Sequence, residues 1–161
     1  MKIVIALRLL RGGQVLEVKF YNQVDNTLLK FAVVFARYQG KWVYCRHKDR
    51  DTYEAPGGHR ELGESIEMAA KRELYEETGA VEYDIKPVCV YSVEGKTRVN
   101  ESGVESFGKL FYAEIYRFEE LPGYEIEEVR FFDDLPQELT YPLIQPVLLK
   151  KLQENNYVKE G

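Results

Sequence analysis

The stretch from Gly58 to Ala80 constrains the structure of this chain more than any other part of its sequence. Its second half predicts a helix from Ser65 to Thr78, because Ser65 is a suitable N-cap and Gly79 suits the left-handed position that follows a helix. Apolar residues that recur every four positions would form the buried side of this helix: Ile66, Ala70 and Leu74. The stretch therefore predicts a loop that leads into a capped, amphipathic helix.

The same helix would carry three glutamates on one side. Glu73 and Glu77 are i,i+4 neighbours and Glu76 follows Glu73 by three residues, so their carboxylates crowd together. Hard oxygen ligands gathered in this way suit Mg²⁺ or Mn²⁺, and Arg72 could brace them by charge-assisted hydrogen bonds with Glu64 as a partner. The alternative is a solvated acidic helix face, since Glu is a good helix former. That alternative suffices for any one glutamate but not for the whole combination.

The rest of the chain predicts strands and a second helix. Strands are expected at residues 1–8, Val15–Tyr21, Leu29–Tyr38, Lys41–Cys45, Ile85–Val93, Val104–Tyr116 and Ile126–Phe132. A helix from Thr140 would turn three residues toward the core: Leu143, Val147 and Leu148. The polar loop from His47 to Glu64, of about 18 residues, is long enough to indicate a functional segment. With no linker or repeat, residues 1–161 predict a single α/β domain with a sheet between helices.

Charge and cysteine content narrow the function classes. The chain has 27 acidic residues and 22 Lys and Arg, so its formal net charge is −5. This charge argues against binding duplex DNA through a basic surface. Cys45 and Cys89 lie in apolar segments and form no CxxC pair, so we expect reduced core residues rather than a zinc site. The first apolar run ends at Arg8, too short to span a bilayer. A cytoplasmic protein without a membrane partner is therefore expected.

The fixed positions of the Gly58–Ala80 stretch resemble the Nudix box, G-x5-E-x7-R-E-U-x-E-E-x-G-U, where U is a bulky aliphatic residue. The matching residues are Gly58, Glu64, Arg72, Glu73, Leu74, Glu76, Glu77 and Gly79. Ala80 is smaller than the usual last residue of the box, a departure that concerns packing rather than chemistry. A weaker resemblance extends from Phe31 to Leu152, and residues 1–30 look like an added N-terminal strand element.

The resemblance implies a Nudix α/β/α sandwich with a mixed β-sheet between its helices. It also implies a metal-dependent hydrolase that cleaves a phosphoanhydride bond in a nucleoside diphosphate linked to another group, X. By the family's pattern, Mg²⁺ or Mn²⁺ would be held by the Gly58 carbonyl, Glu73, Glu76 and Glu77. Glu64 and Arg72 would support this centre, and Glu77 or Glu76 would accept a proton from the attacking water.

Residues outside the box extend the expected site. Glu125 resembles an additional metal ligand of MutT-like members, with a solvated strand edge as the alternative. The substrate would be contacted by Arg46, His47, Arg50, Tyr53 and Gly57, with ordinary surface charge as the alternative for the basic residues. Tyr53 or Tyr141 could stack on a base. The polar segment Glu94–Glu105 would be either a mobile substrate loop or a long turn.

The run from His47 to Gly58 resembles the bacterial YtkD-like branch of the family. Members of that branch hydrolyse nucleoside triphosphates, including oxidised guanine nucleotides such as 8-oxo-dGTP, and some act on RNA 5′ ends. MutT-like enzymes read the oxidised base partly with an Asn near the start of the last helix. Ile144 stands at that position here, so this mode of base recognition is not expected.

Two other function classes compete with a hydrolase. A non-catalytic Nudix-fold protein that binds nucleotides as a regulator would not need several mutually repelling glutamates. A structural protein with a chance acidic helix would not need the full spacing. The sequence therefore favours the enzyme, acting as a monomer or a homodimer.

Overall fold

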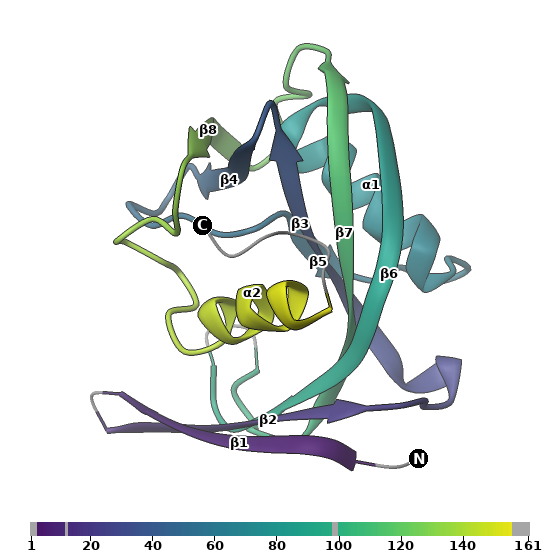
Figure 1. Cartoon of the computed structure of the whole chain (residues 1–161), viewed down its shortest axis with the longest axis vertical. Helices are drawn as coiled ribbons and strands as arrows, with labels where there is room; N and C mark the ends of the chain where they lie inside the picture. The colour runs from purple at the N-terminus through teal and green to yellow at the C-terminus, as the bar shows by residue number, and fades with distance from the viewer. Residues whose placement is uncertain (1–2, 12, 98–99, 156–161) are drawn as a thin grey trace.

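The computed structural model describes residues 3–11, 13–97 and 100–155, in which one mixed sheet lies between two helices (Figure 1). The strands are β1 (Ile3–Arg11), β2 (Gln14–Tyr21), β3 (Leu29–Tyr38), β4 (Lys41–His47), β5 (Gly57–His59), β6 (Ala80–Glu94), β7 (Ser106–Phe118) and β8 (Ile126–Phe132). The helices are α1 (Ile66–Thr78) and α2 (Gln145–Glu154), and a 3₁₀ turn, η1 (Asn26–Leu28), precedes β3. The expected α/β sandwich with a mixed sheet is confirmed.

The central strand of the sheet is β3, and the residues of its apolar run are divided between the two faces. The strands lie in the order β1-β2-β6-β7-β3-β4-β8, with β5 paired to β3. β3 and β7 run parallel, whereas β3 pairs antiparallel with β4 and β5. Since successive side chains point to opposite faces, Ala32 and Val34 belong to one core cluster and Phe35 to the other. A strand that is covered on both sides has this continuous apolar character.

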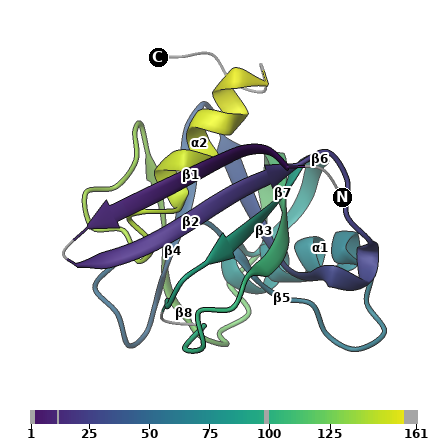
Figure 2. The same cartoon turned by 90° about the horizontal axis from the view of Figure 1, so that it is seen from below.

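Each face of the sheet is covered by one helix. The predicted buried side of α1 is confirmed, because Ile66, Ala70 and Leu74 are all buried in the first cluster. On the opposite face, Leu148 and Leu152 of α2 belong to the second cluster. The β1–β2 hairpin contributes to this second cluster and passes in front of α2 in the view of Figure 2.

The second helix starts later than predicted. It begins at Gln145 rather than at Thr140, with Pro146 in its first turn. Thr140 is held instead by the segment before the acidic helix, because its N–H donates to the Tyr53 carbonyl oxygen and its hydroxyl lies 2.7 Å from that of Thr52. A tertiary contact thus replaces the helical conformation that the apolar pattern predicts. Leu148 is fully buried, and Leu143 and Val147 pack against the same cluster while partly buried.

Several strands are longer than the sequence predicts. β6 begins at Ala80 instead of Ile85, because its first residues pair with the end of β7, as in Ala80↔Phe118. β1 continues past Arg8 to Arg11 because it pairs with β2; residues 1 and 2 lie outside the described part. β2 in turn pairs with β6, so the N-terminal hairpin extends the sheet.

Two further features follow from the described residues. Cys45 and Cys89 are both free, the first buried and the second partly so. Neither helix in residues 3–11, 13–97 and 100–155 has the length and apolar character needed to cross a membrane.

Candidate active site

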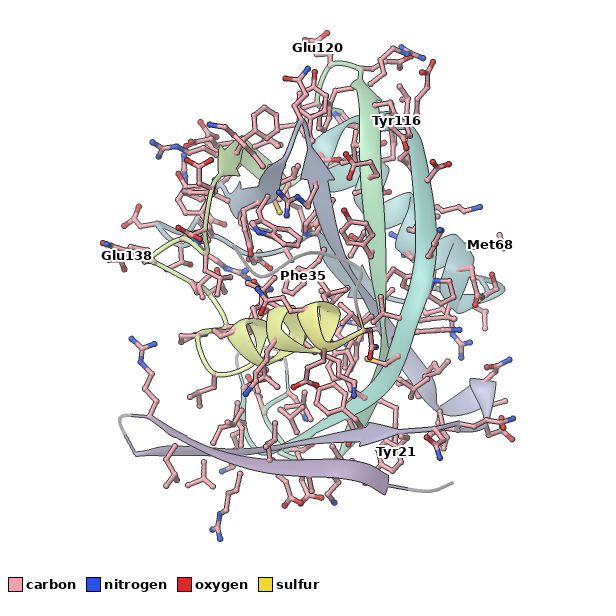
Figure 3. The ribbon with its side chains drawn as sticks, in the orientation of Figure 1. Tyr21, Phe35, Met68, Tyr116, Glu120 and Glu138 are labelled. Atoms are coloured by element: carbon pink, nitrogen blue, oxygen red, sulfur yellow. The ribbon has the colours of Figure 1, made fainter. Side chains whose placement is uncertain are left out.

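Helix α1 is held at both ends by the residues that the sequence indicates. The Ser65 hydroxyl oxygen accepts a hydrogen bond from the Met68 N–H, and Gly79 follows the helix with φ 80°. Met68 lies on the side of α1 that faces away from the sheet and is exposed (Figure 3). The opposite side packs on β3 and β5. The fixed rotation of the helix therefore turns its glutamates toward the Gly57–Gly58 segment.

Arg72 lies at the centre of the carboxylate cluster. Its Nε and Nη2 donate to the two oxygens of Glu64 at 2.6 and 3.0 Å. Its Nη1 donates to Glu73 at 2.7 Å and to Glu76 at 3.2 Å, and Nη2 also donates to the His59 carbonyl oxygen at 3.0 Å. The hydrogen bonds from Arg72 hold the pKa of Glu64 below its ordinary value. Arg72 thus braces three carboxylates and ties α1 to β5, the role that the sequence predicts for it.

The two glycines of β5 allow the carboxylates to lie against the backbone. The Gly57 N–H donates to Glu77 Oε1 at 2.7 Å. A Cβ atom at Gly58 would lie 2.6 Å from Glu73 Cδ, so the Glu73 carboxyl group occupies the space that a side chain at residue 58 would fill. A glycine at residue 58 leaves room for this position of the Glu73 carboxyl group.

His47 and Arg50 bring positive charge to the same place. His47 Nε2 lies 3.3 Å from Glu77 Oε2 and 3.7 Å from Glu54 Oε1, and its Nδ1 lies 3.9 Å from Glu125. Arg50 Nη1 donates to Glu54 Oε1 at 2.6 Å. The hydrogen bond with Glu77 raises the pKa of His47, although desolvation opposes this shift.

The buried carboxyl groups remain short of positive charge. Desolvation, and then the charge of Glu77, raise the pKa of Glu73 to about 7. Desolvation also raises the pKa of Glu77, although His47 and the Gly57 N–H stabilise its ionised form. Buried carboxyl groups that repel one another hold protons until a cation compensates them. A divalent cation would supply this charge.

These groups open into a cleft of about 590 Å³, a size typical of small-molecule sites. One wall carries the carboxyl groups of Glu54, Glu73, Glu77 and Glu125. The start of α2 and the residue before it also contribute to the lining, with apolar surface from Leu148 and Ile144, here called the α2 wall. The cleft lining therefore combines charged groups with apolar surface.

The chemistry of the carboxylate wall fits a hard divalent cation, for which oxygen donors are the preferred ligands. Glu73, Glu77 and the Gly58 backbone would hold it, since they approach one another on this wall. In the described residues, no three His, Cys, Asp or Glu side chains are gathered as a metal-binding group. The carboxylates instead contact Arg72, His47 and the Gly57 N–H. The predicted ligand set, Gly58, Glu73, Glu76, Glu77 and Glu125, stays a prediction.

The structure brings most of the predicted site residues to this cleft. The predicted residues that line it are His47, Arg50, Gly57, Gly58, Glu73, Glu77 and Glu125. Five others lie outside its lining, among them Arg72 at the centre of the carboxylate cluster. Glu64 and Glu76 contact Arg72 instead, Arg46 pairs with Glu128 at 3.4 Å, and the Tyr53 ring packs on Phe132.

Among the cleft residues that were not predicted as site residues, Glu54 and Gln145 are buried and polar. Glu54 is 7% exposed, pairs with Arg50 and lines the cleft. Gln145 is 3% exposed, and its Oε1 accepts a hydrogen bond from the Ala55 N–H at 3.1 Å. The position of Glu54 just before the box was a weak indication in the sequence that it belongs to the site. Nothing in the sequence indicated Gln145, because its position in the cleft depends on a contact with Ala55, 90 residues away.

Comparison with known proteins agrees with this geometry. The NUDIX domain family matches residues 27–133. The chain is 32% identical over 153 residues to YtkD of Bacillus subtilis (strain 168), which carries the provisional name 8-oxo-dGTP diphosphatase, with 89% of this chain and 92% of YtkD covered.

Solved structures show the same architecture. The crystal structure of the Bacillus subtilis pyrophosphohydrolase BsRppH matches with a TM-score of 0.76 and 27% identity, covering 97% of this chain and 100% of that one. A UDP-X diphosphatase matches with a TM-score of 0.66 and 21% identity, covering 86% and 68%, which is a likeness of fold. Since the family match spans more than half of the chain, the chain belongs to the Nudix hydrolase family.

Proposed function

We propose that this Nudix hydrolase is a divalent-metal-dependent pyrophosphohydrolase that cleaves a phosphoanhydride bond in a nucleoside diphosphate linked to X, with a nucleoside triphosphate as the substrate. The observation that carries the proposal is a cleft whose lining combines several carboxyl groups with apolar side chains. A nucleoside triphosphate has the same division, with a charged polyphosphate at one end and a flat base at the other. The carboxylate wall would hold the metal and the phosphates, and the α2 wall would hold the nucleoside.

The expected cofactor is Mg²⁺ or Mn²⁺. When bound, such an ion neutralises phosphate charge and makes a bound water more acidic. Glu73, Glu77 and the Gly58 carbonyl oxygen would hold it, with Glu125 as a further ligand. Arg72 and Glu64 would keep these ligands in position, since Arg72 donates to Glu64 and Glu73 at once.

Glu77 is the residue that we propose as the acceptor of the proton from the attacking water. It lines the cleft, whereas Glu76, the other candidate, contacts Arg72 outside the lining. The Gly57 N–H fixes one oxygen of Glu77, and its second oxygen contacts His47. Positioning by two partners would keep the carboxylate aligned with the water.

Phosphate binding falls to Arg50 and His47. Both line the cleft beside the carboxylate wall, and Glu54 holds the Arg50 guanidinium in place. Charge-assisted hydrogen bonds from these groups would orient the polyphosphate. Arg46 and Tyr53 lie outside the cleft lining, so their proposed contact with the substrate would require the substrate to extend beyond it.

The name of YtkD makes oxidised dGTP a substrate to test, and RNA 5′ ends remain a second substrate class. The experiment is a panel of ribo- and deoxynucleoside triphosphates, 8-oxo-dGTP and a 5′-triphosphorylated RNA oligonucleotide. Each is incubated with Mg²⁺ or Mn²⁺ in ¹⁸O-labelled water, with a chelated sample as the control.

Turnover that requires the metal supports the proposal, and the phosphorus that carries the label identifies the bond attacked. Binding without turnover across the panel would favour a nucleotide-binding regulator instead. Hydrolysis that continues undiminished in the chelated sample would contradict metal dependence.

A further inference from the structure

One end of the cleft is lined by basic and uncharged polar residues instead of carboxyl groups. These residues, here called the basic end, are Lys30, His59, Arg60, Thr97, Asn100 and Ser106. The pairing of the strands places them together. The Arg60 N–H donates to the Lys30 carbonyl oxygen at 2.7 Å, and Ser106 starts β7, which runs parallel beside the start of β3. Thr97 and Asn100 follow β6, whose end pairs with the start of β7.

The 3₁₀ turn η1 holds the two cations of the basic end beside each other. Lys30 Nζ donates to the Thr27 carbonyl oxygen at 3.3 Å, and Arg60 Nη1 donates to the Asn26 carbonyl oxygen at 3.2 Å. These two carbonyl groups belong to consecutive residues, so the ammonium and guanidinium groups lie close together. An ammonium group has three donors and a guanidinium group has five. Both groups therefore keep donors for a ligand.

Neither cation has a carboxylate partner in the described part of the chain, where Lys30 and Arg60 form no salt bridge. Carboxylates near them in the sequence have other partners. The Asp25 carboxylate accepts two hydrogen bonds from within η1, and Glu61 lies 3.7 Å from Arg72. Two adjacent cations that are not neutralised repel each other. An anion bound between them would remove this repulsion.

A hydroxyl group accompanies these cations. Ser106 pairs with Val93, which lines the cleft, and residues directly opposite each other on paired strands share a face of the sheet. The Ser106 side chain therefore lies on the cleft side, and the described residues give its hydroxyl group no hydrogen-bond partner. An ammonium, a guanidinium and a hydroxyl group together suit the oxygens of a phosphate.

The basic end is separate from the carboxylate wall. The carboxylates of that wall approach β5 at Gly57 and Gly58, whereas Arg60 comes two residues after Gly58. Since a strand rises about 3.3 Å per residue, the Arg60 backbone lies about 7 Å along the chain from Gly58. A phosphate that binds a metal ion at the carboxylate wall would not reach Lys30 and Arg60 as well. A phosphate at the basic end is therefore an additional one.

We propose that Lys30 and Arg60 form a second anion subsite, which binds a phosphate group that the substrate carries in addition to those at the carboxylate wall. The inference rests on the proposed function, since it needs a nucleotide in this cleft. Two kinds of nucleotide provide such a phosphate: one with a longer 5′-phosphate chain, and one with a phosphate on its 3′-oxygen. The chemistry that is recognised is the same in both.

The test compares kcat and KM for GTP, guanosine 5′-tetraphosphate and GTP with an added 3′-phosphate, each with Mg²⁺. One of the two extended nucleotides should have a KM below that of GTP by about 10- to 100-fold, the contribution of hydrogen bonds to charged groups. Its identity shows where the additional phosphate is attached. The kcat should stay similar, because a subsite away from the attacked bond binds ground state and transition state alike. High salt should reduce the difference in KM, since exposed charges are screened.

The double variant Lys30→Gln/Arg60→Gln removes both charges. Each glutamine keeps an NH₂ donor for the carbonyl oxygens of η1, so the melting temperature should change little. The KM of the preferred extended nucleotide should become equal to that of GTP in this variant, and each single variant should lose part of the difference.

Lys86→Gln is the matched control, because Lys86 is exposed on β6 and lies outside the cleft lining. It is expected to leave the KM ratio unchanged. Equal KM values for the three nucleotides in the wild type, or a preference that the double variant retains, would overturn the inference.

Failure of the proposed function would be seen separately. If the wild-type chain hydrolyses none of the three nucleotides, their binding to it is measured by calorimetry with Mg²⁺ present. Tighter binding of an extended nucleotide than of GTP, abolished in the double variant, would then support the subsite although the hydrolase proposal had failed. Equal or absent binding of all three would overturn the inference as well.

Discussion

The neighbouring glycines Gly57 and Gly58 have different surroundings. We infer that the first is needed for the fold and the second for the site. A Cβ atom at Gly57 would lie 2.5 Å from the Ala32 carbonyl oxygen, which is backbone of β3. A Cβ atom at Gly58 would meet the carboxyl group of Glu73 instead, the far end of a flexible side chain. A side chain at residue 57 would therefore disturb the pairing of β5 with β3. A side chain at residue 58 would displace Glu73, a proposed metal ligand.

Alanine at residue 57 should mainly reduce stability, whereas alanine at residue 58 should mainly reduce activity. We expect Gly57→Ala to lower the free energy of unfolding by about 1–3 kcal/mol, because backbone must move. Gly58→Ala should cost less than about 1 kcal/mol but reduce kcat/KM by about 10- to 100-fold, because the Glu73 carboxylate is displaced. Urea denaturation and steady-state kinetics measure the two effects. Equal losses of stability in both variants would contradict this assignment.

Glu77 combines burial with a proposed chemical role. We expect Glu77→Gln to reduce kcat/KM by about 10²- to 10⁴-fold, the usual contribution of a positioned proton acceptor. The amide oxygen can still accept from the Gly57 N–H, and a neutral side chain avoids the cost of a buried charge, so the melting temperature should not fall. Glu120→Gln is the control, since Glu120 lies at the exposed tip beyond β7, far from α2 (Figure 3). Turnover within a few-fold of the wild type would rule out this role.

At the scale of elements, helix α1 positions the site because both of its ends are determined. Gly79, the residue that caps the C-terminal end of α1, has a positive φ and lies against Glu119, which follows β7. A Cβ atom there would be 2.5 Å from the Glu119 carbonyl oxygen, and the Glu119 N–H donates to the Gly79 carbonyl oxygen at 2.8 Å. The end of the helix is thus joined directly to the sheet.

Replacement of Gly79 should therefore destabilise the protein more than replacement of a glycine with the same conformation elsewhere. Gly123 has φ 87° but open space around it, so Gly123→Ala should cost about 1–2 kcal/mol for the left-handed conformation alone. Gly79→Ala should cost about 1–3 kcal/mol more, because of the contact with Glu119. Thermal and urea denaturation of the two variants measure the difference. Similar losses in both would show that the contact with Glu119 carries no strain.

At the scale of the whole molecule, a polar network joins the N-terminal hairpin to the sheet. Glu105 accepts hydrogen bonds from the Tyr21 hydroxyl on β2 and the Ser92 hydroxyl on β6, both at 2.6 Å. Lys19 lies 3.8 Å away. Desolvation opposes ionisation of Glu105, but the hydrogen bonds from Ser92 and Tyr21 and the charge of Lys19 outweigh it, so its pKa lies below the ordinary value.

This network predicts a pH-dependent contribution to stability. Because the pKa of Glu105 is lowered in the folded state, the contribution is complete above the unfolded value of about 4.3 and is lost as the pH falls through the folded pKa. We expect Glu105→Gln to lower the free energy of unfolding by about 1–3 kcal/mol at pH 7, with the difference shrinking below about pH 4. Glu101→Gln, an exposed site, is the control in urea denaturation. A difference that does not change with pH would contradict the assignment.

The sequence alone determined the acidic helix, the central strand and the family. The caps at Ser65 and Gly79 agree with the structure, because they follow from contacts between residues a few positions apart. The bounds of Leu29–Tyr38 also agree, because a continuous apolar run marks a strand that is covered on both faces. The carboxylates that line the cleft, Glu73 and Glu77, were predicted for the same reason. Local spacing is sufficient where a helix sets the geometry.

Only the tertiary structure decided which residues face these carboxylates. Arg46 and His47 are adjacent, yet β4 turns Arg46 to Glu128 and His47 to Glu77. Gln145 reaches the cleft because α2 starts late and packs beside Ala55. The periodicity of a segment shows which of its sides is buried but not which distant segment lies against that side. The register and the packing of the folded chain decide that.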